Sequence, residues 1–379
     1  MIYLDNAATS LPKPSAVGKA VMEAINTFGN SSRGAHDFSI RASCAVFETR
    51  LKLAELFGAE KADRIVFTSN ATSALNTAIL GTATPGCHII STDIEHNSVL
   101  RPLYRLEEEQ KISLSFVRAS REGTIKTEDF EKAITPQTRI IAVNHASNVT
   151  GTMTDLRAIG EIARRHSLLL IADASQTAGS EPIDVNDMNI GILCFNGHKG
   201  LMGPQGTGGM YIADNVTVRP LTTGGSGVDS YNHKHPSALP AALEAGTLNS
   251  HGIAGLSAAL DFIKETGIEN IKNKKDRLND LFRSEAAKIP GITLYGNVSQ
   301  PHVSITALNV GGCSSDIIAD ALNTDYGIAV RGGAHCAPRM HEALGTEKSG
   351  AVRFSFSCFN TEDDVKTAIG ALKDLSTRI

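Results

Sequence analysis

Short apolar runs alternate with helical patterns between about residues 61 and 215. The runs cover residues 64–67, 87–90, 139–143, 168–171 and 192–195. Leu168–Ala172 is apolar throughout, which indicates a strand that is buried on both faces, as in a parallel sheet covered by helices. Leu156, Ile159, Ile162 and Ala163 follow helical spacing behind Thr154, which predicts a helix with a threonine cap. The alternation predicts an α/β domain with a mostly parallel sheet.

The pattern changes from about residue 256 onward to a helix-rich α+β piece. Residues 352–356 alternate between apolar and polar, which predicts a half-buried strand. No internal repeat, low-complexity run or long linker interrupts the chain. With 379 residues, the chain is long enough for one large domain with a good core and a smaller one.

The composition is that of a soluble globular protein, with 41% hydrophobic and 20% charged residues. A net charge of −4 gives no electrostatic reason to expect nucleic acid or an anionic membrane as partner. No apolar run reaches membrane-spanning length and residues 1–5 lack signal-peptide features, so we expect a cytoplasmic protein. The six cysteines form no CxxC pair, which argues against a disulfide framework and a zinc site; we expect no metal. Cys87, Cys194 and Cys358 lie in apolar stretches and are expected in the core.

A lysine flanked by glycine lies directly after the run at residues 192–195. In the stretch Phe195–Gly200, Lys199 is placed at the end of a predicted strand. A desolvated lysine has a lowered pKa and is then a nucleophile that forms Schiff bases. Taken alone, however, this motif is better explained by a surface lysine in a turn.

An aspartate ends the preceding buried strand. Asp173 follows Leu168–Ala172, and a carboxylate in that position is costly unless a cation or hydrogen-bond donors meet it. An ordinary helix N-cap is the alternative for Asp173 alone. Pyridoxal 5'-phosphate (PLP) pairs its protonated ring nitrogen with an aspartate and its aldehyde with a lysine. Asp173 and Lys199 together therefore favour a PLP site.

These residues resemble a known family. Asp173-Ala174-Ser175-Gln176 followed by Gly197-His198-Lys199 resembles the class V aminotransferase group of PLP enzymes, and the match runs from Leu4–Thr9 to Arg353. The stretch Arg331–Ala337 is similar to the Arg-x-Gly-x-His-Cys-Ala signature of cysteine desulfurases and selenocysteine lyases, with Ala334 in place of a frequent histidine. The resemblance implies PLP fold type I, with a mostly parallel seven-stranded sheet in a large domain (16–255). The smaller α+β domain would comprise residues 1–15 and 256–379.

The resemblance also assigns the cofactor contacts. A helix beginning after Phe67 would offer its free N–H groups to the phosphate, where Ala71 and Thr72 match the family. His96 would stack on the ring and could move protons, while Asn148 and Gln176 would lie at the phenolic oxygen. His198 would contact the phosphate, and Asn196 stands where a phosphate-binding serine is frequent. Thr247 would complete the phosphate site of the neighbouring subunit, which implies a homodimer.

The resemblance further implies the reaction. Arg353 would capture the substrate carboxylate, with Ala7, Asn148 and His36 near the substrate. Lys199 would remove the Cα proton, and the Cys336 thiolate would attack the substrate sulfur. An imidazolium or another basic group nearby would increase the thiolate population.

The expected function is a cysteine desulfurase that converts L-cysteine to L-alanine, forms a persulfide on Cys336 and passes sulfur to an acceptor protein. Selenocysteine lyase, with selenium as cargo, shares every motif and is the alternative. A transaminase or β-lyase and a non-catalytic PLP-binding scaffold are further alternatives.

Overall fold

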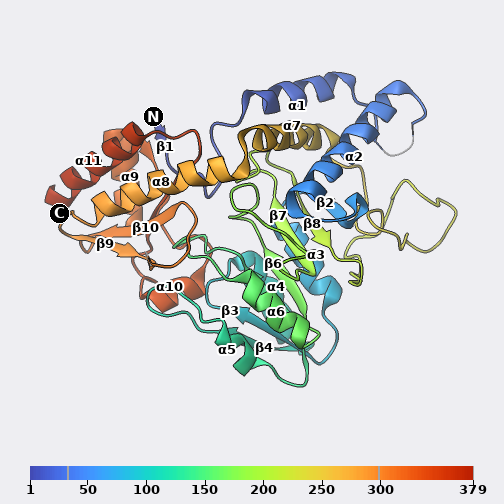
Figure 1. Cartoon of the computed structure of the whole chain (residues 1–379), viewed down its shortest axis with the longest axis horizontal. Coiled ribbons are helices and arrows are strands. Elements are labelled where there is room, and N and C mark those ends of the chain that lie inside the picture. The colour runs from blue at the N-terminus through green and yellow to red at the C-terminus, as the bar shows by residue number, and fades with distance from the viewer. Residues whose placement is uncertain (32–33, 298, 379) are drawn as a thin grey trace.

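A seven-stranded sheet forms the centre of the computed structural model, which describes residues 1–31, 34–297 and 299–378 (Figure 1). The strand order is β2-β8-β7-β6-β5-β3-β4; β8 is antiparallel to both neighbours and the other pairings are parallel. Its strands are β2 (Ile65–Thr68), β3 (Cys87–Thr92), β4 (Ile112–Val117), β5 (Thr138–Asn144), β6 (Leu169–Asp173), β7 (Ile192–Asn196) and β8 (Gly208–Ile212). The predicted mostly parallel sheet is thereby confirmed.

Successive residues of the central strands enter different hydrophobic clusters. In β7, Leu193 and Phe195 belong to one cluster, whereas Ile192 and Cys194 belong to the other. Successive side chains of a strand point to opposite faces, so a strand covered on both sides must be apolar at every position. This packing explains the uninterrupted apolar runs. It also confirms the core position of Cys194, and Cys87 and Cys358 are buried as well.

The helices of this part are α1 (Ser15–Thr27), α2 (Asp37–Phe57), α3 (Ala71–Thr82), α4 (Asn97–Glu108), α5 (Glu128–Ala133), α6 (Leu156–Arg165) and α7 (Ser250–Thr266), with a 3-10 turn at Ala62–Arg64. The predicted Thr154 cap of α6 is wrong. Asp155 is the N-cap residue, and its Oδ1 accepts a hydrogen bond from Ala158 N at 3.0 Å. Thr154 lies one residue too early, and its buried hydroxyl has no partner among the described residues.

The C-terminal part has its own core. An antiparallel sheet of order β12-β10-β9 and a parallel pair β1-β11 pack with helices, and the N-terminal Leu4 joins this cluster (Figure 1). Its elements are β1 (Ile2–Tyr3), α8 (Ile268–Ala286), β9 (Ile292–Tyr295), β10 (Ile305–Val310), α9 (Ser315–Tyr326), β11 (Ile328–Ala329), α10 (Pro338–Leu344), β12 (Val352–Ser355) and α11 (Glu362–Arg378). The division at residue 256 stays a prediction; α7, which spans it, packs on α1 and α2.

Candidate active site

A cavity of about 200 Å³ lies where the carboxyl ends of β5, β6 and β7 meet the amino ends of α3 and α4. The carboxyl ends of parallel strands share one edge of a sheet, which is where α/β proteins bind ligands. The structure brings nine predicted residues together in this cavity: Ala71, Thr72, His96, Asn148, Asp173, Gln176, Asn196, His198 and Lys199.

The Lys199 amine makes no hydrogen bond with another described residue. Burial lowers its pKa to about 8, and the charge of Asp173 partly opposes this shift. A lysine that loses its proton near pH 8 has a substantial neutral fraction under physiological conditions. It can therefore act as a nucleophile or as a base.

Asp173 ends β6 and is buried. Its Oδ1 accepts hydrogen bonds from the Ser175 N–H at 2.8 Å and from the Ser175 hydroxyl. Its Oδ2 has no hydrogen bond with a described residue, so it is free to meet a cation in the cavity. The end of β6 therefore places a buried carboxylate at the cavity, as the sequence predicted.

His96 is the N-cap residue of α4. Its Nδ1 accepts the Ser98 N–H at 3.0 Å, which places a neutral ring's proton on Nε2. Burial lowers the pKa of His96, so the neutral ring is favoured. The Ser98 hydroxyl is 2.8 Å from the Thr72 hydroxyl and lines the same cavity, a contact that the sequence did not reveal.

Glu95 is a second residue that sequence reasoning missed. It is fully buried; its Oε1 accepts from Thr92 Oγ1 at 2.6 Å and from Asn144 N at 3.1 Å. Burial raises the pKa of Glu95 to about 8. The available signal was an acidic residue three positions after the end of β3, the strand that contains Ile89 and Ile90.

The amino end of α3 is capped from two sides. Asn70 Oδ1 accepts from Ser73 N at 2.9 Å, and Asn196 Oδ1 accepts from Ala71 N at 2.8 Å. The Asn196 oxygen must face the helix, so its amide NH2 is the group left for the cavity. Asparagine therefore differs from serine at this position. Its oxygen accepts the Ala71 N–H, and its NH2 group is left to donate a hydrogen bond to a ligand in the cavity.

His198 lies beside the N-terminal arm, with Nδ1 3.2 Å from the Thr9 hydroxyl. Burial and the nearby Lys199 lower the pKa of His198 to about 4, so its ring is neutral and can only offer a neutral donor.

Arg353 lies behind Asn148 rather than on the wall of the cavity. Its Nη1 donates to Asn148 O at 2.9 Å and its Nη2 to Asp5 Oδ1 at 3.0 Å. Arg331 donates to the other oxygen of Asp5 at 3.0 Å. The Asp5–Arg331–Arg353 group was not predicted, although Asp5 lies in the N-terminal motif. Ala7 is close by, and its N–H donates to Ser355 Oγ at 2.8 Å.

The Cys336 loop is tied to this site by two hydrogen bonds. Asn148 Nδ2 donates to His335 O at 2.7 Å, and Asn97 N donates to Cys336 O at 2.7 Å. His335 and Cys336 both have positive φ angles, +48° and +56°, and Cys336 is exposed. The chain therefore turns sharply at the thiol and presents it to solvent.

His335 does not supply the expected positive charge. Its Nε2 donates to Ala351 O at 2.8 Å, and burial lowers its pKa to about 3. Its ring is neutral at physiological pH, so the idea that an adjacent imidazolium promotes the Cys336 thiolate is wrong for His335.

Five predicted residues lie outside the cavity lining of their own chain: Arg353, Ala7 and Cys336, described above, and His36 and Thr247. His36 is exposed, with Nε2 3.2 Å from Ser39 Oγ, and Thr247 is exposed directly after a bend at Gly246. Ser32 and Arg33, which precede His36 in its loop, lie outside the described residues.

The residues present fit PLP. Asn148 Oδ1 is buried without a partner among the described residues, so it can accept a hydrogen bond from a phenolic O–H of the cofactor. Asp173, Lys199 and the first turn of α3 all line the same cavity. A ring-nitrogen acceptor, an amine and a phosphate cradle are therefore present together.

The chain belongs to the Aminotransferase class-V family, whose profile matches residues 2–367. This family is PLP-dependent. Among the relatives, a probable cysteine desulfurase from Methanothermobacter thermautotrophicus is 33% identical and covers 99% of this chain and 94% of its own length. A cysteine desulfurase from Haloferax volcanii is 27% identical over 98% of this chain and 88% of its own length.

Solved structures of cysteine desulfurases resemble the fold of this chain. A cysteine desulfurase from Thermococcus onnurineus NA1 superimposes with a TM-score of 0.93 at 32% identity, covering 100% of this chain and 95% of its own. One from Escherichia coli gives 0.88 at 30% identity, covering 99% and 94%. Among the described residues, the helices are too short or too polar to span a bilayer.

Proposed function

We propose that this protein is a PLP-dependent cysteine desulfurase. One observation carries the proposal beyond family membership: Asn148, which lines the cofactor cavity, also donates a hydrogen bond to the backbone of the loop that presents Cys336. An exposed thiol on a loop that is bonded to the cavity wall has a use in a reaction that moves sulfur, whereas a transaminase has no need of it.

The roles follow from where the groups lie. When bound, the cofactor supplies an electron sink at the substrate Cα. Lys199 takes the Cα proton on its neutral amine, and Asp173 Oδ2 holds the proton on the cofactor's ring nitrogen. Arg353 lies behind Asn148. Its positive charge attracts the substrate carboxylate to that side of the cavity.

Cys336 Sγ then forms a bond to the substrate sulfur as the substrate's Cβ–S bond breaks. The electron pair stays on Cβ, which takes up a proton, so alanine leaves and the sulfur remains as a persulfide on Cys336. Because Cys336 is exposed, an acceptor protein can reach this persulfide directly. Transfer to such an acceptor completes the proposed cycle.

We also propose that the enzyme is a homodimer that shares its phosphate site through Thr247. The exposure of Thr247 supports this idea, as do exposed apolar side chains on neighbouring parts of the chain. These side chains are Met22, Ile25, Phe38, Phe47, Leu221 and Tyr231. A Thr247→Ala variant should remain dimeric in light scattering but bind PLP more weakly; full PLP affinity in a stable monomer would contradict the proposal.

The test of function is a product assay on L-cysteine and L-selenocysteine. A desulfurase forms alanine and sulfide or persulfide in equal amounts from cysteine, without keto acid. Keto acid as the main product would show a transaminase or β-lyase. Turnover restricted to selenocysteine would make the lyase the better description.

A further inference from the structure

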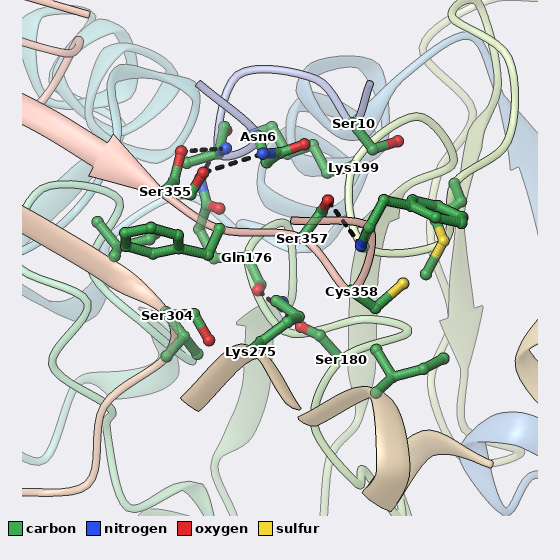
Figure 2. A pocket seen from close by; sticks show the side chains of 18 residues that line it. Asn6, Ser10, Gln176, Ser180, Lys199, Lys275, Ser304, Ser355, Ser357 and Cys358 are labelled. Carbon is green, nitrogen blue, oxygen red and sulfur yellow. Dashed lines mark hydrogen bonds between the residues drawn. The ribbon is translucent and has the colours of Figure 1, made fainter. Parts of the chain in front are cut away.

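A second, smaller cavity lies on the other side of Lys199. Lys199 and Gln176 line both cavities, while the other described residues of the two linings differ. The second cavity lies where the N-terminal arm, the loops after β6 and β7, α8 and the segment after β12 come together (Figure 2). Its lining includes Ala7, which the resemblance places near the substrate, but the cavity itself has no role in the reaction as derived so far.

The size of this cavity limits what it can hold. Its volume is about 40 Å³. One water molecule needs roughly 10–15 Å³ of such space, so there is room for about three water molecules and for no organic ligand. The lining combines apolar side chains such as Met202, Ile271 and Phe356 with polar groups that can hold water. The polar groups are Gln176 and five serines: Ser10, Ser180, Ser304, Ser355 and Ser357.

The far end of the cavity is formed by Lys275 of α8, which Figure 2 shows below Gln176 and opposite Lys199. No hydrogen bond or ion pair joins the Lys275 amine to another described residue. Burial lowers the pKa of Lys275, which eases the loss of its proton. A partly buried amine without a protein partner needs water to satisfy its donors.

Beyond Lys275 lies a group of charged side chains that reaches the surface. Glu181 and Asp276 act on Lys275 electrostatically, and both are paired with Lys272. Asp276 also accepts from Ser304 Oγ, which lines the cavity, at 3.1 Å. The Cys358 thiol faces Lys275 from the segment after β12. Lys272 and Asp276 are about a quarter exposed, so this group can exchange protons with solvent.

We propose that this cavity is a water-filled proton path that connects the Lys199 amine to Lys275 and thereby to solvent. The inference rests on the proposed function, in which Lys199 takes a proton from Cα in each turnover. The Lys199 ammonium passes a proton to the first water, and the last water passes one to the Lys275 amine after that amine has lost its own proton. Lys275 then releases a proton through the group around Asp276. Lys275 acts through Lys199 and does not touch the substrate.

The fate of the Cα hydrogen tests this path separately from the rate. Cysteine deuterated at Cα is converted in ordinary water, and the deuterium retained at Cα of the alanine product is measured by mass spectrometry. An open path exchanges the hydrogens of Lys199 with solvent and keeps retention low. Lys275→Met should raise the retained fraction severalfold. Turnover should fall by less than the ~100-fold that loss of a direct acid–base group costs, because Lys199 remains.

Two further variants test whether a change in deuterium retention comes from proton transfer, rather than from the loss of a positive charge or from poor folding. Lys275→Arg keeps the positive charge but cannot release its proton, so it should raise retention like Lys275→Met. Lys274→Met removes an exposed lysine of the same helix and should leave retention at the wild-type value. Low retention in Lys275→Met, or wild-type behaviour of Lys275→Arg, would overturn the path.

A measurement on the unaltered enzyme keeps the proposal open to refutation if these variants fold poorly. A high-resolution crystal structure should show ordered water between the two lysines, whereas a dry cavity would contradict the path. If the wild-type enzyme makes no alanine from cysteine, the proposed function fails instead, and the water structure still reports on the cavity.

Discussion

Replacing Asp5 by asparagine should destabilise the protein through Arg353. The side chain of Arg353 is 3% exposed, and its guanidinium has two acceptors, Asp5 Oδ1 at 3.0 Å and Asn148 O at 2.9 Å. Its Nε has no partner among the described residues. Asp5→Asn leaves a buried positive charge without its counter-charge, which costs roughly 3–5 kcal/mol. Asparagine keeps one oxygen, so we expect the lower end, about 3 kcal/mol.

The assay is equilibrium unfolding in urea, with a matched variant that removes the exposed half of the same group. Arg331 also pairs with Asp5 but is 52% exposed, so Arg331→Ala should cost no more than about 1 kcal/mol. Adding Arg353→Met to Asp5→Asn removes the stranded charge and should restore part of the loss. The reasoning is refuted if Asp5→Asn costs no more than Arg331→Ala, or if the second substitution restores nothing.

Of three further predictions, one concerns the buried Glu95 and two concern the cofactor cavity. Burial raises the pKa of Glu95 to about 8 from 4.5, so the folded chain holds a proton that the unfolded chain releases, and stability falls as the pH rises between these values. Glu95→Gln should remove this fall in urea unfolding; an unchanged slope would contradict it. Because the pKa of Lys199 is about 8, the apoprotein should take up PLP faster as the pH rises through that value in stopped-flow absorbance, with no second rise near 10.5. Asn196→Asp keeps the acceptor for Ala71 N but turns a charge toward the phosphate, worth about 4 kcal/mol at 4 Å. PLP should therefore bind at least tenfold more weakly while pyridoxal, which lacks the phosphate, binds as before; equal losses for both would contradict it.

The strand ends of the site could be predicted because they depend on local patterns. Uninterrupted apolar runs placed β6 and β7, and the polar residues that follow them, Asp173 and Lys199, do share one cavity. The strand β4 was missed, although Ile112, Leu114 and Phe116 alternate with serines and could have indicated it.

The features that could not be predicted arise from contacts between distant segments. The neutral state of His335 depends on burial and on the Ala351 carbonyl. A Cβ on Gly332, three residues before His335, would lie 2.7 Å from Ser315 O. Close packing against α9 requires glycine at this position, and no local pattern in the sequence shows that.

The central claim is that Cys336 carries the substrate's sulfur, and peptide mass spectrometry tests it most directly. After exposure to cysteine without an acceptor, the Cys336 peptide should gain the mass of one sulfur atom, while the peptide of Cys44, another exposed cysteine, should not. Cys336→Ala should lose sulfide release from cysteine, and Cys44→Ala should keep it. Sulfur found on a different cysteine, or unchanged sulfide release by Cys336→Ala, would contradict the account.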